Sequence, residues 1–132
     1  MSVYIDADAF ARWEKGEFDL PAWLEARGDE PAAFPAIVWQ QLIFGVFAWQ
    51  PERAAKRNRS LLLMGGLAVA PFSRSHATRA AQLTSELKLK TIGVADLQIA
   101  ATALVDGAEL LTFNRAHFDR VPGLVLAATS ND

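Results

Sequence analysis

The sequence of 132 residues contains no cysteine. Disulfide bridges, cysteine-ligated metals and thiolate nucleophiles are therefore excluded as sources of stability or activity. The sequence also lacks an uninterrupted apolar run of about 20 residues, the length that a membrane-spanning helix requires. It does not open with a charged segment followed by an apolar one, as a secretory leader does. We therefore expect a soluble, cytoplasmic protein that makes no contact with a membrane.

A strong net charge of either sign is missing as well. Lys and Arg number 13 and Asp and Glu number 15, which gives a formal net charge of −2. The whole chain therefore does not attract nucleic acid, and any contact with RNA or DNA must come from a local group of cations. Four cations after Pro51 are candidates for such a group, on the exposed face of a predicted helix: Arg53, Lys56, Arg57 and Arg59. Charged faces of this kind are more often simply solvated.

Apolar side chains, by contrast, are plentiful. Hydrophobic residues make up 52% of the chain, and they include four Trp. At this length such a composition predicts a single folded domain over residues 1–132 with a substantial core. We expect most of the Trp side chains in that core, although an exposed Trp would suit a partner protein.

Short β-branched or aromatic runs alternate with helical patterns along the chain. We predict strands at residues 3–5, 67–72, 109–112 and 123–126, with helices between them, one of which runs over residues 74–89. The apolar segment 35–49 is predicted as a strand at its start and a helix from Gln41 onward. This alternation is typical of a parallel sheet covered on both faces. The expected fold is a three-layer α/β/α sandwich with a central, mainly parallel sheet of four or five strands.

Three polar residues stand at the ends of predicted elements. Asp6 follows the first strand, Asn114 follows the strand at 109–112, and Asp96 lies in the first turn of a later helix. Each has an ordinary explanation, because Asp and Asn favour turns and helix caps, and acids are favoured by the helix dipole. Asp8 is expected to cap the first helix, since Asp6 stands early for that role.

Together the same three residues favour a metal site. The carboxyl ends of parallel strands lie at one edge of the sheet, where ligands bind in α/β proteins. Neighbouring carboxylates repel one another unless a cation is present, and Mg²⁺ and Mn²⁺ prefer such oxygen ligands. A cation there activates water and stabilises charge on a phosphate, so the pattern predicts phosphodiester hydrolysis. Spacing alone does not bring the side chains together.

Four segments carry a resemblance to a known family. Residues 4–8 resemble an opening strand that ends in the first acid, and residues 39–45 resemble a segment Glu-Leu-x-x-Gly. Residues 92–101 are close to a helix that carries the third acid, and residues 111–118 resemble a segment Thr-x-Asn/Asp-x-x-x-Phe. Over nearly its whole length the chain resembles a PIN domain, and most of all the VapC-type ribonuclease toxins of bacterial toxin–antitoxin pairs.

The resemblance implies roles for individual residues. Asp6 and Asp96 would bind metal and, together with Asn114, carry catalysis. The family further implies an endoribonuclease that depends on Mg²⁺ or Mn²⁺, an RNA substrate, a cognate antitoxin protein and a homodimer. Arg115 lies next to the proposed site, and we count it with Arg53 and Arg57 as a candidate for contact with RNA.

One departure from the family pattern stands out. The family's Glu falls on Gln41, which keeps an oxygen but lacks the charge and cannot easily act as a base. Asp8 could return the missing charge in a supporting role, giving a rearranged site of Asp6, Asp8 and Asp96. The alternative is a catalytically weakened PIN module that binds RNA or a protein partner without cleaving it. A hydrogen bond from Gln41 to Asp6 or Asp96 would favour that alternative.

Overall fold

The computed structural model describes residues 2–64, 66–87 and 92–129. These residues build a parallel sheet with the strand order β3-β2-β1-β4. Its strands are β1 (Val3–Ile5), β2 (Ala32–Pro35), β3 (Ala68–Ala70) and β4 (Glu109–Leu111). β1 is central, with Tyr4 opposite Ala33 of β2 on one side and Leu110 of β4 on the other.

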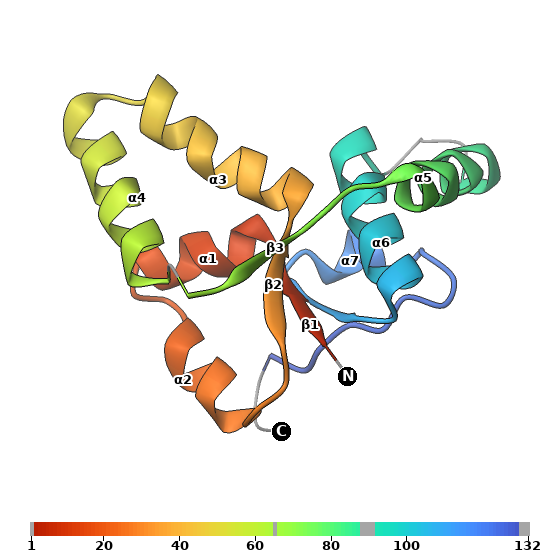
Figure 1. Cartoon of the computed structure of the whole chain (residues 1–132), viewed down its shortest axis with the longest axis horizontal. Coiled ribbons are helices and arrows are strands. Elements are labelled where there is room, and N and C mark those ends of the chain that lie inside the picture. Colours follow the sequence, from red (N-terminus) through yellow and green to blue (C-terminus); the bar gives the residue numbers. More distant parts are fainter. Residues whose placement is uncertain (1, 65, 88–91, 130–132) are drawn as a thin grey trace.

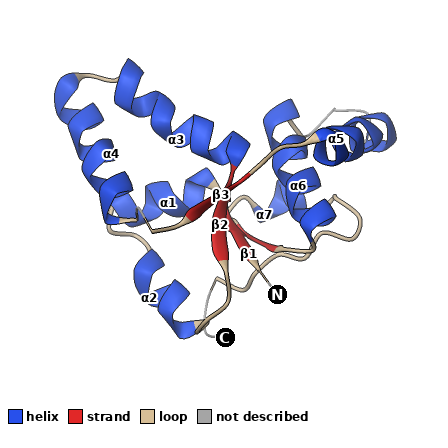
Figure 2. Cartoon of the chain, viewed as in Figure 1, coloured by secondary structure: helices blue, strands red, loops and turns tan. Residues whose placement is uncertain are grey.

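Helices connect and cover these strands (Figure 1). They are α1 (Ala7–Glu14), α2 (Leu20–Ala26), α3 (Ala36–Ala48), α4 (Pro51–Leu63), α5 (Arg74–Leu87), α6 (Val94–Asp106) and α7 (Arg115–Phe118). Figure 2 shows the strands between α1–α4 on one side and α5 and α6 on the other. The predicted three-layer α/β/α fold with a parallel sheet is therefore confirmed. No helix in the described part of the chain has the length and apolar character needed to cross a membrane.

The boundaries of some predicted elements were wrong. The strand expected at the start of segment 35–49 lies earlier and ends at Pro35. α3 begins at Ala36 because its buried residues Val38, Leu42 and Gly45 already follow helical spacing. Residues 123–126 form no full strand; a turn at Gly123 with φ +82° precedes a single parallel bridge between Leu126 and Leu110. The predicted end of the helix at residue 89 lies outside the described residues.

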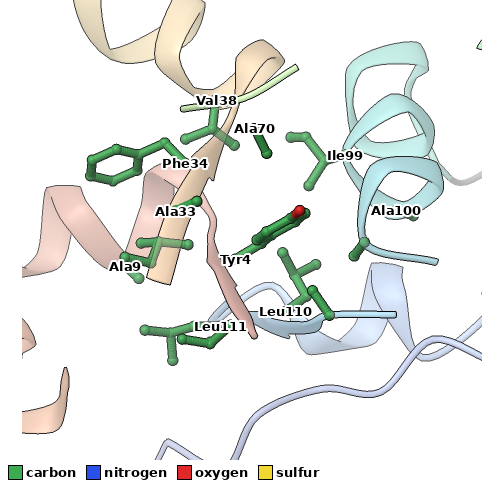
Figure 3. Packing of buried hydrophobic residues seen from close by; sticks show 14 of the residues in the cluster. Tyr4, Ala9, Ala33, Phe34, Val38, Ala70, Ile99, Ala100, Leu110 and Leu111 are labelled. Carbon is green, nitrogen blue, oxygen red and sulfur yellow. The ribbon is translucent and has the colours of Figure 1, made fainter. Parts of the chain in front are cut away.

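The core packs helix α6 closely against the centre of the sheet. Figure 3 shows Tyr4 and Leu110 directed toward Ile99 and Ala100 of α6, with Leu111 on the opposite side of the sheet. Ile99, Ala100, Leu110 and Leu111 are completely buried. Side chains of neighbouring strand residues alternate between the two faces, so both faces of the central strands are covered by helices.

A polar network fixes the far end of α6. Asp106, its last residue, accepts a hydrogen bond from the Tyr4 hydroxyl of β1 and lies 2.8 Å from Nε2 of His76 in α5. Nδ1 of His76 accepts the backbone N–H of Ser73 at 2.9 Å, just before α5 begins. The C-terminal end of α6 is thus tied to both β1 and α5. This contact helps to set the position of the whole helix, including Asp96 in its first turn.

A close contact in α3 gives the first testable prediction. A Cβ added to Gly45 would lie 2.8 Å from ring atoms of Trp49, which is closer than such atoms normally approach. Overpacking costs about 1–3 kcal/mol, and contacts this short with an aromatic ring belong to the upper part of that range. Because Ala gains roughly 1 kcal/mol over Gly in a helix, we expect Gly45→Ala to lower the free energy of unfolding by a net ~1–2 kcal/mol. Urea denaturation measures the difference.

Gly66→Ala is the matched control, because a Cβ at Gly66 meets nothing within 4 Å. Its stability should stay within about 0.5 kcal/mol of the unmodified protein, as for most surface substitutions. If Gly45→Ala unfolds at the same urea concentration as the unmodified protein, the ring of Trp49 does not constrain this position.

Candidate functional site

The candidate site lies where β1 and β4 end side by side. From β1 the chain passes through α1 toward β2, whereas from β4 it passes through α7 to Leu126, which pairs with Leu110. Neighbouring parallel strands whose connections leave in opposite directions open a crevice at their carboxyl ends. Asp6 directly follows β1 and Thr112 directly follows β4, so both stand at this crevice.

Asp6 is buried and fully oriented by its neighbours. One carboxylate oxygen, Oδ1, accepts the backbone N–H of Ala7 at 2.8 Å, and Oδ2 accepts the hydroxyl of Thr112 at 2.8 Å. Asp6 is therefore the N-cap of α1, and the prediction that Asp8 takes this role was wrong. The reason is that α1 already begins at Ala7, and Asp6 has the extended backbone of a cap residue.

Asp8 lies in the first turn of α1 and binds the segment after β4. Its two carboxylate oxygens accept the backbone N–H of Phe113 at 3.1 and 3.2 Å. The buried hydroxyl of Thr112 donates a hydrogen bond to Asp6 and accepts one from the backbone N–H of Asn114 at 3.0 Å. Asp8 and Thr112 thus hold the start of α1 and the end of β4 together around Asp6.

Asp96 approaches the crevice from the first turn of α6. Its Oδ2 lies 3.6 Å from Nδ1 of His117, a partly exposed residue of α7. The same ring nitrogen lies 2.9 Å from Nδ2 of Asn114. Asn114 and His117 therefore connect Asp96 to the segment that follows β4. His117 stands beside an acid of the site rather than in the core.

The carboxylates act on one another electrostatically. Burial and, after it, the charge of Asp8 raise the pKa of Asp6 to about 7, and the charge of Asp96 adds to this rise. The hydrogen bonds from Thr112 and Ala7 oppose the rise only in part. Burial also raises the pKa of Asp8, against the stabilising N–H of Phe113 and the positive charge of Arg12. The structure thus brings Asp6, Asp8 and Asp96 into one electrostatic unit.

The donor set is small for a metal site. No group of three or more His, Cys, Asp or Glu side chains among the described residues is arranged to hold an ion. Both oxygens of Asp6 and both oxygens of Asp8 already accept hydrogen bonds, so hydrogen bonding does not decide which of these acids would bind an ion. Mg²⁺ is commonly held by one or two carboxylates, with water and a substrate phosphate completing its shell. A hard divalent cation therefore fits the residues present.

Gln41 lies on α3 beside the crevice. It is exposed and lines a pocket of about 370 Å³ that is completed by Ile37, Gln40, Phe44, Ala95 and Gln98. Ala95 precedes Asp96 in α6, but the residues that line the pocket do not include Asp6, Asp8 or Asp96. Within the described chain, the hydrogen-bond and ion-pair partners of Asp6 and Asp96 are Ala7, Thr112 and His117. The contact from Gln41 that would favour a non-catalytic module is not formed.

The three arginines proposed for RNA contact lie in different environments. Arg53 is exposed on α4, and its guanidinium lies 3.7 Å from the ring centre of Trp49. Arg57 is only 6% exposed and pairs with Glu14, so its prediction as a surface cation was wrong. Helical spacing places Arg57 on the same buried face of α4 as Ala54 and Leu61. Arg115 is exposed and donates to the carbonyl of Ala127 at 3.0 Å.

Two further residues belong to the site. Thr112 has no role in the sequence-based prediction, and its hydroxyl donates a hydrogen bond directly to Asp6. His117, on α7, lies next to Asp96 and Asn114. A signal for both existed, because Thr112 opens the segment Thr-x-Asn and His117 follows Asn114 by three residues, one helical turn.

Comparison with known proteins agrees with this geometry. The family model of the PIN domain matches residues 3–124. The chain is 28% identical to Ribonuclease VapC1 of Rickettsia felis over the full length of both, and 30% identical to Ribonuclease VapC10 of Mycobacterium tuberculosis over 88% of this chain and 85% of that protein. Its fold matches that of VapBC2 from Rickettsia felis, solved with a promoter DNA fragment, with a TM-score of 0.84 at 24% identity over 96% of this chain and 98% of that one. The chain therefore belongs to the PIN-domain family, in which its relatives are ribonucleases named VapC.

Proposed function

We propose that this protein is a metal-dependent endoribonuclease that acts as the toxin of a toxin–antitoxin pair. The observation that carries the proposal is the buried carboxylate of Asp6, whose pKa is raised to about 7 beside two further acids. Such an arrangement is unfavourable without a cation and is typical of functional sites. The names of the relatives, Ribonuclease VapC1 and VapC10, support the same reaction.

Asp6 and Asp96 are the residues that would hold Mg²⁺ or Mn²⁺. When bound there, such an ion supplies a water of lowered pKa and stabilises charge on the phosphate and the leaving oxygen. Thr112 orients the Asp6 carboxylate through its hydroxyl, and Asp8 holds the segment after β4 in place through Phe113. Asn114 keeps His117 beside Asp96, so that both side chains can contact the substrate.

A protein partner is supported by exposed apolar side chains on α3 and α4. Phe47 is 82% exposed and Leu63 is 77% exposed, and Phe44 and Leu62 are also exposed. Exposed apolar side chains gathered on neighbouring elements mark surfaces that bind other proteins. We propose that a cognate antitoxin and a second copy of the chain, in a homodimer, cover such surfaces. The solved relatives named VapBC are toxin–antitoxin complexes, which supports this proposal.

The second candidate function is a PIN module that binds RNA or a protein without cleaving it. Gln41 in place of the family's Glu favours it, because a neutral amide beside the crevice binds a cation more weakly than a carboxylate. The small set of carboxylate donors favours it as well. Both candidates share the fold and the acids, so they differ only in metal affinity and cleavage.

We predict that the purified protein binds Mn²⁺, and that Asp6→Asn/Asp96→Asn abolishes the binding detected by isothermal calorimetry. Asp8→Asn should weaken binding by only about 10- to 100-fold, as residues that support ligands do. Thermal melts verify that each variant is folded. A protein without detectable affinity for Mn²⁺ up to millimolar concentration is not a metal-dependent nuclease. Equal losses in Asp8→Asn and the double variant would make Asp8 a ligand.

The affinity for Mn²⁺ should depend on pH. The pKa of Asp6 is raised to about 7, so its proton must leave before the carboxylate can bind a cation. Raising the pH from 6 to 8 increases the ionised fraction of such a group about tenfold, and the affinity should increase by about the same factor. Calorimetry in buffers of different ionisation enthalpy counts the released proton. An affinity that stays constant between pH 6 and 8 contradicts the role of Asp6.

Gln41→Glu tests whether the neutral amide limits the site. We expect the added carboxylate to raise the affinity for Mn²⁺ by about tenfold or more, because hard cations favour charged oxygen ligands, and to speed the cleavage of a mixed-sequence RNA. Gln40→Glu is the matched control, since Gln40 is exposed and lines the same pocket. If Gln41→Glu and Gln40→Glu raise the affinity for Mn²⁺ equally, the added negative charge acts only through long-range electrostatics and not as a metal ligand. If neither they nor the unmodified protein cleave RNA, the non-cleaving module is the better description.

A further inference from the structure

A second cationic site lies between α1 and α4, apart from the carboxylates. It is a pocket of about 300 Å³, lined by Ala11, Glu14, Lys15, Trp49, Arg53, Lys56 and Arg57. Four of these residues are cations and one is an acid, which leaves three positive charges without a counterpart in the lining. The whole chain carries a formal net charge of −2. A local excess of positive charge on an acidic protein indicates a binding site for an anion.

The buried pair of Arg57 and Glu14 forms the rigid part of this pocket. Nη2 of Arg57 donates to Oε1 of Glu14 at 2.7 Å, and Nε donates to Oε2 at 2.9 Å. The remaining nitrogen, Nη1, donates to the carbonyl of Leu42 at 3.0 Å. These bonds join α4 to α1 and α3 and use the charge of Arg57 internally. The ligands for an anion must therefore be Lys15, Arg53 and Lys56.

These three residues are exposed, and none of them has an ion-pair partner within the described chain. Arg53 is held over Trp49, with 3.7 Å between its guanidinium carbon and the ring centre. Stacking fixes the plane of the guanidinium and leaves its edge for bidentate contact with a phosphate. An aromatic ring among cations is also typical of surfaces that bind single-stranded nucleic acid. The chemistry of the pocket thus favours a phosphodiester group.

Helix α1 connects the pocket to the candidate active site. Asp6 and Asp8 stand at its start, and Lys15 follows its last residue, Glu14. Its eight residues correspond to a length of about 12 Å at 1.5 Å per residue. Arg12 lies between the two ends, 4.4 Å from the ring centre of Phe113. Cations thus continue from the carboxylates along α1 toward the pocket.

We propose that the pocket binds a backbone phosphate of the RNA strand a few nucleotides away from the bond that is cleaved. Lys15, Lys56 and the stacked edge of Arg53 are its ligands. This proposal rests on the proposed ribonuclease function and adds the direction in which the substrate leaves the active site, along α1 toward α4. It also gives the protein a preference for longer RNA, because a short fragment at the carboxylates does not reach the pocket.

The test measures binding of a labelled dinucleotide and of labelled single-stranded RNA of 12 nucleotides by fluorescence anisotropy, in EDTA so that no cleavage occurs. The unmodified full chain should bind the longer RNA more tightly. Lys15→Gln/Lys56→Gln should lose at least tenfold in affinity for the 12-mer and keep its affinity for the dinucleotide. The slope of log Kd against log salt should fall by up to about 0.7, because the pocket neutralises one phosphate and each neutralised phosphate of a single strand contributes roughly 0.7.

Arg74→Gln/Arg79→Gln is the matched control, since it removes two positive charges from α5 on the other side of the sheet. It should bind both RNAs like the unmodified protein. If Lys15→Gln/Lys56→Gln binds the 12-mer as tightly as the control does, or if RNA length has no effect on affinity, the pocket is not an RNA subsite. Poly-glutamate is then added as a competitor. If it binds in this pocket and the 12-mer stays bound elsewhere on the protein, the pocket is a site for an acidic protein segment and the proposal is overturned.

The two proposals fail in different ways. In the first case the unmodified chain cleaves RNA in Mn²⁺, Asp96→Asn does not, and Lys15→Gln/Lys56→Gln binds the 12-mer unchanged. This result would contradict the subsite and support the ribonuclease. In the second case binding depends on RNA length, the lysine variant loses this dependence, and the unmodified chain does not cleave RNA in Mn²⁺. This result would support the subsite and contradict the ribonuclease. Measuring both activities on the same preparations therefore separates them.

Discussion

The burial of one carboxylate at the end of the central strand organises this protein. Asp6 caps α1, accepts the hydroxyl of Thr112 from β4, and lies under the influence of Asp8 and Asp96. Its hydrogen bonds reduce the energetic cost of burial but do not remove it, because its pKa remains raised to about 7. The fold thus keeps an unfavourable group at the switch point of its sheet, and only a cation or a proton can satisfy it.

The fold could be predicted because its signals are local and repeated. Alternating strands and helices indicate a parallel sheet wherever they occur, and three of the four strands agree closely with their predicted positions. The errors lie where local signals compete. Pro35 ends β2 and Ala36 begins α3. Because the residues on both sides of this boundary are apolar, composition does not reveal where the strand ends and the helix begins. Residues 123–126 have strand composition, but after the turn at Gly123 only one parallel bridge forms, in which Leu110 bonds to Val125 and Ala127 on either side of Leu126.

The site was less predictable, since it depends on the direction of single side chains. Asp6 and Asp8 are two residues apart, and only the start of α1 at Ala7 decides which of them caps the helix. Arg57 belongs to a basic run in the sequence, yet it turns inward because its position on α4 faces Glu14. Charge in a sequence is therefore not charge on a surface. Thr112 opens the segment Thr-x-Asn, but the burial of its single hydroxyl leaves no periodic pattern that would assign it a role.

The charge distribution links the neutral Gln41 to the rest of the site. A fourth acid beside Asp6, Asp8 and Asp96 would raise the repulsion in a crevice where burial already raises the pKa of Asp6. Gln at this position lowers that repulsion in the metal-free protein and, by the same physics, lowers the gain when a cation arrives. A bound cation stabilises the folded protein to the extent of its affinity for the folded state. We propose that Gln41 lowers the affinity for metal and, in return, the repulsion in the metal-free site, while the hydrogen bonds that orient Asp6 come from Ala7 and Thr112.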